Sequence, residues 1–319
     1  MHASRAHDAL NTGARSPWGS AYPLLTITAF LWSLNFVVGR GIQGQLPPLA
    51  MAFWRWALAF LVLLPFAAAP MWRQRAIIAR EWRILAILGV LGAGSFNTLV
   101  YIGLGSTTAT NALLINSSIP VLIAGIGWLF MSQKVSPRQA AGILVSLFGV
   151  ASIVFRGEVA QLLAFRINPG DVWVFSAMIV WAVYTLLLRR RPADLDPLPF
   201  LAATILIGAT ANLPFYLADL AGGAQAHWTA ASFAAVAYFG IFPSVIAYLF
   251  WNRAVAEVGP ARAGVFVHLM PVFGTLLAIQ FLGETFHAYH AFGFTLIIVG
   301  ILVSSIAGKK SLAHRAGTD

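Results

Sequence analysis

Ten runs of predominantly apolar residues, each about 20 residues long, follow one another along the chain. Each run is long enough to cross the hydrocarbon core of a bilayer as an α-helix, because a helix rises about 1.5 Å per residue. A soluble domain has about a quarter of its residues charged, whereas only 9% of these 319 residues are charged. The predicted fold is therefore an all-α membrane protein with ten transmembrane helices.

Short connections containing proline, glycine or charged residues separate the runs. The predicted spans are residues 21–42, 49–70, 83–105, 108–131, 138–155, 170–189, 198–219, 231–252, 260–282 and 288–307. The first run lacks a convincing cleavage site and is interpreted as a retained span rather than a signal peptide. Residues 1–20 and 308–319 are expected to be the N-terminal and C-terminal tails.

The basic residues predict the orientation of the spans. With the N-terminus in the cytoplasm, 16 of the 20 Lys and Arg residues lie on the inner side and only three, Arg40, Arg156 and Arg166, on the outer side. Cytoplasmic loops of membrane proteins carry an excess of Lys and Arg. Both tails are therefore expected to be cytoplasmic, and this bias explains the net charge of +10 better than nucleic-acid binding does.

Catalytic and metal-dependent classes of membrane protein find little support in the sequence. There are no cysteines, which excludes disulfides, thiolate metal sites and cysteine nucleophiles. Protease motifs and a P-loop are absent, and the two histidines of HAYH (287–290) have no third ligand nearby. We expect no enzymatic activity, no catalytic residues, no cofactor and no metal site.

The chain contains an internal repeat. Residues 88–150 align without a gap on residues 239–301 at an offset of 151, and the earlier spans align at an offset of 149. The matched pairs include Trp32 with Trp181, Gly89 with Gly240, Pro120 with Pro271, Gly142 with Gly293, and Gly149 with Gly300. Because five spans is an odd number, the second copy is inverted in the membrane. Inverted repeats are typical of carriers with a substrate site between the copies.

The second copy carries a recognisable pattern, AGVFVHLMPVFGTLLAIQFLGE (263–284), with Pro271, the pair Gly283–Glu284, and Gly293 and Gly300 in the next span. In these features the chain resembles the drug/metabolite transporter superfamily in its ten-helix form with two EamA repeats. The first copy has Gln133 at the place of the acid. The resemblance implies a first EamA repeat over 21–155, a second, inverted one over 170–307, and a multi-pass protein of the bacterial plasma (inner) membrane. It is strongest to YddG-type bacterial amino-acid exporters.

We call residues at equivalent positions of the two copies mated. Two mated prolines indicate a site near mid-membrane. Proline in a helix removes one hydrogen bond and frees the carbonyl group four residues earlier, so Pro120 and Pro271 predict helix kinks, with Ser117 and His268 three residues before them. Other polar and aromatic residues are mated across the copies at spacings of three or four, which places them on one helix face. We expect a central cavity lined by Trp32, Asn35, Asn97, Tyr101, Asn116, Ser117, Trp181, Tyr184, Tyr248, Asn252 and His268.

Structural roles remain open for each of these residues. Asn and Ser in membrane helices often hydrogen-bond to neighbouring helices, and a single buried histidine is more often structural than functional. Arg55 lies within the second span, where an ionised group is a functional hypothesis by default. Its mate is Thr204, so no symmetric site is indicated, and we favour a structural or gating role for Arg55.

The expected cargo is a small neutral or zwitterionic metabolite. No Asp or Glu lies in the middle of a span, which favours uncoupled facilitated diffusion, although His268 leaves proton coupling open. The resemblance implies export of amino acids, large neutral or aromatic ones and also Met and Thr, by alternating access. The alternative is a multidrug, organic-cation or other metabolite exporter. Beyond the lipid bilayer, the glycines at 142, 149, 293 and 300 allow either packing between the copies or a homodimer, so the monomer and the homodimer stay open.

Overall fold

The computed structural model describes residues 21–42, 44–158, 160, 167–283 and 285–306, and the regular structure within these ranges is helical. The predicted tails, 1–20 and 308–319, lie outside the described residues, as does Glu284. The first copy consists of α2 (Ala21–Gly41), α3 (Pro48–Arg73), α4 (Arg75–Arg80), α5 (Trp82–Gly89), the π-helix η2 (Val90–Ser95), α6 (Phe96–Leu104), α7 (Ala109–Asn116), α8 (Ile119–Met131) and α9 (Pro137–Val154).

The second copy has the same order of membrane helices, with a π-helix in its third span as in the first copy. It consists of α11 (Pro169–Leu187), the 3-10 helix η3 (Leu188–Arg190), α12 (Pro197–Ala221), α13 (Ala230–Phe239), the π-helix η4 (Gly240–Ile246), α14 (Ala247–Val258), α15 (Pro260–Val265), the 3-10 helix η5 (Phe266–His268), α16 (Leu269–Leu282) and α17 (Ala288–Ile306).

Local sequence signals explain where the helices begin. Helices α3, α9, α11, α12 and α15 start at proline, which lacks the N–H that would be unpaired there. The Ser136 side chain accepts a hydrogen bond from the Gln139 N–H at the start of α9. Asn168 and Asp171 form a reciprocal capping box at the start of α11.

Within the described ranges, nine helical stretches are long and apolar enough to cross a membrane, and α2 adds a further helix of 21 residues. The prediction of ten membrane helices is therefore confirmed. The predicted spans agree with these helices within a few residues, except that the eighth continues from residue 252 to Val258. The charged residues Arg253 and Glu257 ended the apolar run, but the helix itself stops only before Gly259, whose φ is 85°.

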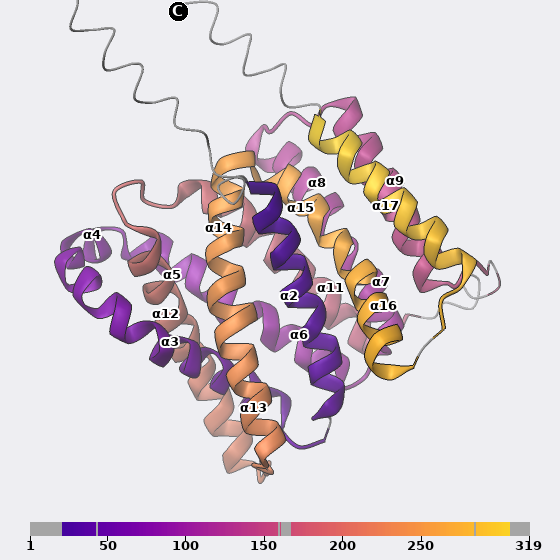
Figure 1. Ribbon diagram of the computed structural model, residues 1–319. Coiled ribbons are helices and arrows are strands. Elements are labelled where there is room, and N and C mark those ends of the chain that lie inside the picture. The colour runs from indigo at the N-terminus through magenta and orange to yellow at the C-terminus, as the bar shows by residue number, and fades with distance from the viewer. Residues whose placement is uncertain (1–20, 43, 159, 161–166, 284, 307–319) are drawn as a thin grey trace, which may run out of the picture.

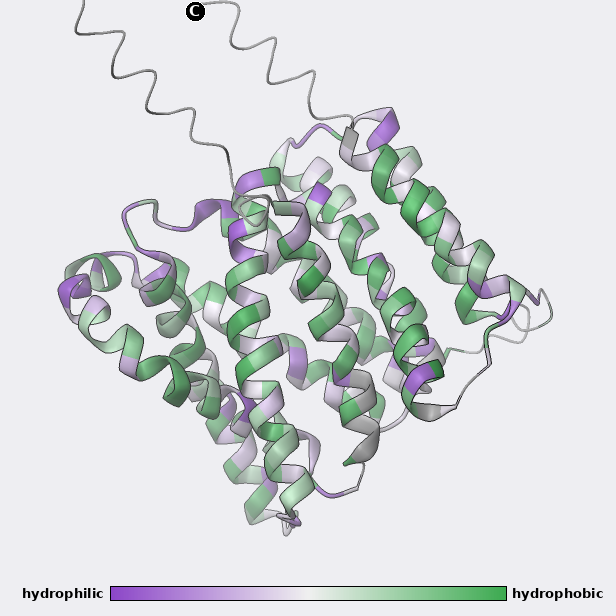
Figure 2. Ribbon diagram, in the orientation of Figure 1, coloured by the Kyte–Doolittle hydropathy of each residue, from purple (hydrophilic) through white to green (hydrophobic). Residues whose placement is uncertain are grey.

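The helices pack in pairs that join the two copies. The most extensive contacts are α9 with α17, α3 with α12, α6 with α11, and α2 with α14. In Figure 1 the pair α9–α17 lies at one side of the molecule, α3–α12 at the other, and α2 and α14 between them. Hydrophobic residues cover most of the length of the helices, and hydrophilic residues gather mainly near their ends (Figure 2). The core of the molecule is thus the boundary between the copies.

Departures from α-helical geometry recur at equivalent positions of the two copies. The π-helix Val90–Ser95 corresponds at an offset of 151 to residues 241–246 of the π-helix Gly240–Ile246. The break between α7 and α8, at residues 117 and 118, corresponds to the end of η5 at His268 and the start of α16. Pro120 and Pro271 follow these two breaks. The internal repeat is therefore a repeat of structure as well as of sequence.

Four mated glycines allow α9 and α17 to approach closely. A Cβ atom at Gly142 would lie 2.5 Å from the carbonyl oxygen of Gly300, and one at Gly149 would lie 2.7 Å from that of Gly293. Real Cβ atoms do not approach backbone atoms this closely, so any side chain here would force the helices apart. These glycines pack the two copies against each other within a single chain.

Candidate functional site

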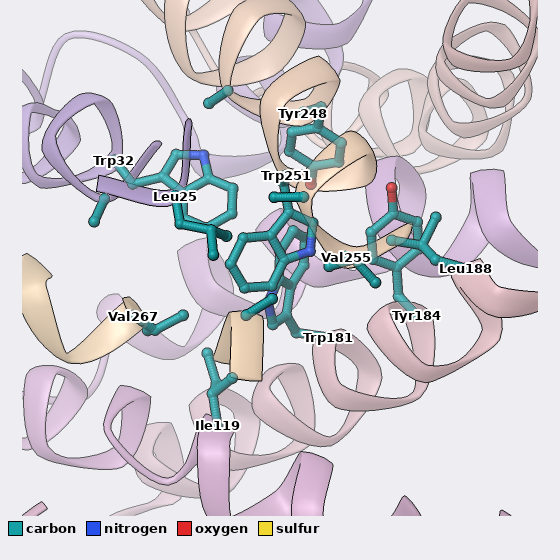
Figure 3. Packing of buried hydrophobic residues seen from close by; sticks show 14 of the residues in the cluster. Leu25, Trp32, Ile119, Trp181, Tyr184, Leu188, Tyr248, Trp251, Val255 and Val267 are labelled. Atoms are coloured by element: carbon teal, nitrogen blue, oxygen red, sulfur yellow. The ribbon is translucent and has the colours of Figure 1, made fainter. Parts of the chain in front are cut away.

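Five aromatic rings meet at the boundary between the copies, and we call them the aromatic cluster: Trp32, Trp181, Tyr184, Tyr248 and Trp251. The ring centroid of Trp32 lies 5.2 Å from those of Trp181 and Trp251, and that of Trp181 lies 5.1 Å from Tyr184 and 5.5 Å from Tyr248. Figure 3 shows the rings side by side, contributed by α2, α11 and α14. The five side chains are 1–8% exposed, so the rings themselves fill this part of the core.

The two π-helices supply carbonyl groups to the aromatic cluster. Trp32 Nε1 donates to the carbonyl oxygen of Pro243 at 3.1 Å, and Tyr248 Oη donates to that of Gly92 at 2.8 Å. Pro243 lies in η4 and Gly92 in η2. A π-helix within an α-helix shifts the hydrogen-bonding register and often occurs at functional sites. Here each π-helix accepts a bond from an aromatic side chain of the cluster.

Several buried polar atoms around the cluster have no hydrogen-bond partner among the described residues. Tyr184 Oη donates to Asn252 Oδ1 at 2.9 Å, while Asn252 Nδ2 and Trp251 Nε1 have no partner. Asn35 Oδ1, three residues after Trp32 on α2, is unpartnered as well. An unmade hydrogen bond at a buried group costs about 1–3 kcal/mol. Such groups in a native core therefore require an explanation, and a ligand that completes them is one.

Next to the aromatic cluster, Arg55 of α3 forms hydrogen bonds with polar side chains of α6 and η4. Its Nε donates to Ser244 Oγ at 2.6 Å, and its Nη1 donates to Asn97 Oδ1 and to Tyr101 Oη, both at 3.1 Å. The Arg55 residue is 2% exposed. Asn97 and Tyr101, which the repeat predicts to line a cavity, thus share one partner that the repeat does not indicate.

The hydrogen bonds of His268 do not involve the aromatic cluster. Its Nε2 donates to the carbonyl oxygen of Ser117 at 2.9 Å, and its Nδ1 lies 2.7 Å from Ser146 Oγ of α9. The His268 residue is fully buried. Asn116 Nδ2 contacts the sulfur of Met270 at 3.9 Å. His268 therefore joins α9 to the break between α7 and α8, and its place on a cavity wall stays a prediction.

The structure has a hollow of about 770 Å³. The segments that line it lie at the end of the molecule where α2 begins and α17 ends, as the ribbon in Figure 1 shows. It lies between the loop after α8, the segment η3 and the turn from α14 to α15. Its charged lining is mainly basic: Lys134, Arg189, Arg191 and Arg262, with Glu257. Leu188 and Val255 also line the hollow, and they pack in the same core as the aromatic cluster (Figure 3).

Hydrogen bonds close the opposite end. Thr229 Oγ1, at the start of α13, donates to Gln45 Oε1 at 2.6 Å. Asp171, at the start of α11, accepts a bond from Asn111 Nδ2 at 3.0 Å and one from Thr107 Oγ1. Each of these contacts joins one copy to the other. Between this closed end and the basic hollow lie the aromatic cluster and Arg55.

Trp251 and Arg55 are prominent in the site, but the comparison of the two copies does not identify either of them. Trp251 contacts both Trp32 and Trp181, but its mate at the offset of 151 is Val100. Its spacing is informative nevertheless, because Tyr248, Trp251 and Val255 lie at i, i+3 and i+7 of one helix face. The charge of Arg55 within a membrane span is visible in the sequence, but spacing does not predict which residues it contacts.

The model of the EamA-like transporter family matches residues 19–155 and again residues 168–306. The chain belongs to the EamA-like transporter family. Each match covers one of the two copies that the sequence and the structure show, and the resemblance to the ten-helix EamA form is confirmed.

Relatives of this EamA-like transporter are named as transporters. The uncharacterized transporter YyaM of Bacillus subtilis (strain 168) is 26% identical over 284 residues, covering 89% of this chain and 93% of YyaM. An uncharacterized transporter of Archaeoglobus fulgidus is 28% identical over 286 residues, covering 88% and 96%. A probable terminal-alkyne amino-acid exporter of Streptantibioticus cattleyicolor is 26% identical over 300 residues, covering 93% and 92%.

One solved crystal structure superposes on this EamA-like transporter with a TM-score of 0.74 at 21% identity, covering 93% of this chain and 99% of that one. At this identity the likeness shows the fold alone. Because the family model matches both copies and the helices are long and apolar enough to span a membrane, the chain is a multi-pass membrane transporter with the EamA fold. Within its described residues, no group of three or more His, Cys, Asp and Glu side chains is placed to hold a metal ion.

Proposed function

We propose that this EamA-like transporter exports amino acids with large neutral or aromatic side chains across the bacterial plasma membrane, without changing them chemically. Both termini are cytoplasmic in this proposal, so the basic hollow faces the cytoplasm. Substrate enters through the hollow, binds between the two copies at the aromatic cluster, and leaves after the opposite end opens. This is alternating access across an inverted repeat.

The aromatic cluster is the observation that carries the proposal. Five rings from both copies lie together with unpartnered polar atoms of Trp251 and of Asn252, which bonds to Tyr184. Ligand sites of this kind combine apolar and aromatic walls with a few polar groups that fix orientation. A large apolar side chain would take the place that the rings now fill, and the unpartnered polar atoms would form hydrogen bonds with the polar groups of the substrate.

The relative named as a probable terminal-alkyne amino-acid exporter supports the same class of cargo. The orientation is supported by the basic residues of the hollow, since cytoplasmic loops are enriched in Lys and Arg. These basic residues would also attract substrates that carry a carboxylate.

Uncoupled facilitated diffusion is supported by the placement of the acidic residues. Of the acidic residues that the structure describes, Asp171 alone is buried. It caps the start of α11 and bonds to Asn111 and Thr107 at the closed end, away from the aromatic cluster. Proton- and sodium-coupled carriers commonly place a carboxylate near the middle of the transport path.

Organic cations are the rival cargo, because a cation can bind over the face of an aromatic ring. Against this class stands the guanidinium of Arg55, which lies 5.2 Å from the ring of Trp56. The ring of Trp56 in turn lies 5.2 Å from that of Tyr248 in the cluster. A buried positive charge at this position disfavours a cationic ligand that has no anionic group.

Counterflow in proteoliposomes tests the proposal. Vesicles containing the purified protein are loaded with unlabelled Phe, Trp, Met or Thr, and labelled amino acid is added outside, with and without a pH gradient. We expect transient accumulation of the label that does not depend on the gradient. Exchange of quaternary amines without exchange of any amino acid would instead establish the organic-cation reading, and gradient dependence would establish proton coupling.

A further inference from the structure

Arg55 carries a buried positive charge whose partners are uncharged. Its three side-chain hydrogen bonds go to the hydroxyl oxygens of Ser244 and Tyr101 and to the amide oxygen of Asn97. In the described part of the chain, no ion pair joins Arg55 to a carboxylate. A buried ion is costly unless an opposite charge compensates it, and here the protein supplies hydrogen-bond acceptors but no counter-charge.

Two further hydrogen-bond donors beside Arg55 are buried and unpartnered. Asn97 Nδ2 has no partner, although Asn97 Oδ1 accepts from the guanidinium. Because the guanidinium is a donor only, the amide must turn its oxygen toward Arg55 and its N–H groups away from it. Trp56 Nε1 is also unpartnered, and its ring lies 5.2 Å from the Arg55 guanidinium carbon. Asn97 and Trp56 are 6% and 0% exposed.

A buried positive charge beside two unpartnered hydrogen-bond donors is suited to an anion with several acceptor positions. An ionised carboxylate accepts up to about four hydrogen bonds and donates none. Arg–carboxylate pairs are among the strongest hydrogen-bonded pairs in proteins. A carboxylate beside Arg55 would neutralise the buried charge and supply the acceptor that Asn97 Nδ2 and Trp56 Nε1 lack.

This group of residues adjoins the aromatic cluster. The ring of Trp56 lies 5.2 Å from that of Tyr248, and Tyr248 contacts Trp32 and Trp181 of the cluster. Ser244, which binds Arg55, follows Pro243, whose carbonyl accepts from Trp32. A ligand with its carboxylate at Arg55 therefore extends its side chain toward the aromatic rings.

We propose that Arg55, Asn97 Nδ2 and Trp56 Nε1 form the subsite that binds the carboxylate of the transported substrate. The identification of that substrate as an amino acid rests on the function proposed above. The carboxylate subsite itself requires only that the substrate carry a carboxylate next to an apolar group. Substrates whose carboxylate is blocked are rejected, because an amide or an amine leaves the guanidinium without a counter-charge.

Three compounds with one side chain separate the contributions to binding. Phenylalanine carries both the ammonium and the carboxylate, phenylalaninamide carries only the ammonium at mildly acidic pH, and 3-phenylpropionate carries only the carboxylate. They compete against labelled phenylalanine in counterflow, and they are added to the purified protein in a thermal-shift assay. The wild-type protein is expected to bind phenylalanine and 3-phenylpropionate at least about tenfold more tightly than phenylalaninamide.

Variants then assign this preference to Arg55. Arg55→Gln is expected to lose at least about tenfold in affinity for phenylalanine and to stop distinguishing it from phenylalaninamide, whereas Arg55→Lys keeps part of the preference. Arg138→Gln, at an exposed arginine near the start of α9, is the matched control and should bind as the wild type does. Equal binding of phenylalanine and phenylalaninamide by the wild type, or an undiminished preference in Arg55→Gln, would overturn the proposal.

The design keeps this inference separate from the proposed function. If the wild-type protein transports no amino acid but is still stabilised by 3-phenylpropionate through Arg55, the function fails and the carboxylate subsite stands. If amino acids are transported but phenylalaninamide is transported equally well, the function stands and the subsite fails. Should Arg55→Gln not fold, Arg55→Lys decides the point: a carboxylate preference equal to that of the wild type would overturn the assignment to Arg55.

Discussion

At the scale of single residues, the side chains that differ between the two copies define the chemistry of the site. Trp32 and Trp181 are mated and meet at 5.2 Å, as an inverted repeat leads one to expect. Arg55 and Trp251, by contrast, correspond to Thr204 and Val100. A substrate with a charged end and an apolar end has no twofold symmetry, so the residues that bind its two ends need not be mated.

Trp181 is the best residue for testing the aromatic cluster, because its ring contacts all four of the others. Aromatic pairs contribute about 0.5–1.5 kcal/mol each beyond the burial of area. We therefore expect Trp181→Ala to reduce amino-acid counterflow about tenfold or more. Trp128 of α8, which is 66% exposed, is the matched control, and Trp128→Ala should transport within about twofold of the wild type.

The loss of transport must be separated from loss of folding. Truncation of a fully buried tryptophan costs about 3–5 kcal/mol, so monodispersity and thermal stability in detergent are measured for each variant. Trp181→Phe keeps a ring in place and serves if Trp181→Ala is unstable. Normal transport of all amino acids by a folded Trp181→Ala protein would show that the cluster is only a packed core.

His268 has a different expected phenotype. His268→Ala leaves the carbonyl group of Ser117 without its donor and the hydroxyl of Ser146 without the contact of Nδ1. Leaving a buried polar group unpaired costs about 1–3 kcal/mol. We expect a clear fall in thermal stability, and we expect Ser146→Ala and His268→Ala to be non-additive in a double-mutant cycle because the two side chains touch. Unchanged stability with abolished transport would instead place His268 on the substrate path.

Repeat matching in the sequence identifies four of the five rings of the aromatic cluster, but not the contacts of the polar residues. Repeat matching finds Trp32, Trp181, Tyr184 and Tyr248, because symmetry-related residues of an inverted repeat meet near the axis that relates the copies. It does not find the partner of Asn97 and Tyr101, since Arg55 lies on a different helix and reaches them through a long side chain. Which way His268 points depends on the break at residues 117–118, and spacing alone does not determine that direction.

At the scale of helices, the crossing of α9 and α17 depends on the absence of side chains. Gly142→Ala places a Cβ atom 2.5 Å from the Gly300 carbonyl oxygen and 2.7 Å from the Ser304 backbone nitrogen. Because both are backbone atoms, the helices must separate, and overpacking of this kind costs about 1–3 kcal/mol. We expect a lower melting temperature for Gly142→Ala in detergent.

Gly125 of α8 provides the control for this substitution. A Cβ atom at Gly125 meets nothing within 4 Å, and alanine favours a helix over glycine by about 1 kcal/mol. Gly125→Ala should therefore be neutral or stabilising. If Gly142→Ala were as stable as Gly125→Ala, helices α9 and α17 would not be in such close contact in the purified protein.

Helix positions are the most predictable feature of this chain. Apolar length, proline at the first turn and short connections locate the ends of most spans within a few residues. The π-helices η2 and η4 are not indicated by the sequence, because Pro243 in one corresponds to Gly92 in the other and neither residue specifies a π-helix. Their carbonyl groups bind Trp32 and Tyr248, so tertiary contacts compensate for the irregular helix.

At the scale of the whole molecule, one end is hollow and basic while the other is closed by hydrogen bonds between the copies. Gln45 with Thr229 and Asp171 with Asn111 form that closure. Transport by alternating access requires these contacts to break when the basic hollow closes. The substrate site between the ends would then be exposed to one side of the membrane at a time.

The orientation of the molecule is directly testable because the chain contains no cysteine. Lys134→Cys places a thiol at the hollow, and Gln225→Cys places one in the exposed turn between α12 and α13 at the opposite end. In intact bacteria, a membrane-impermeant maleimide should label Gln225→Cys but not Lys134→Cys. The reverse pattern would invert the topology, and with it the proposed direction of export.

The most direct test is a structure of the purified transporter determined with bound phenylalanine. We predict density for the amino acid between the two copies, with its carboxylate within hydrogen-bonding distance of the Arg55 guanidinium and its ring against Trp181. The tryptophan rings, which now fill this space, would have moved apart. Phenylalanine bound only among the residues of the basic hollow, with Arg55 and the aromatic cluster unchanged, would contradict the assignment of the substrate site.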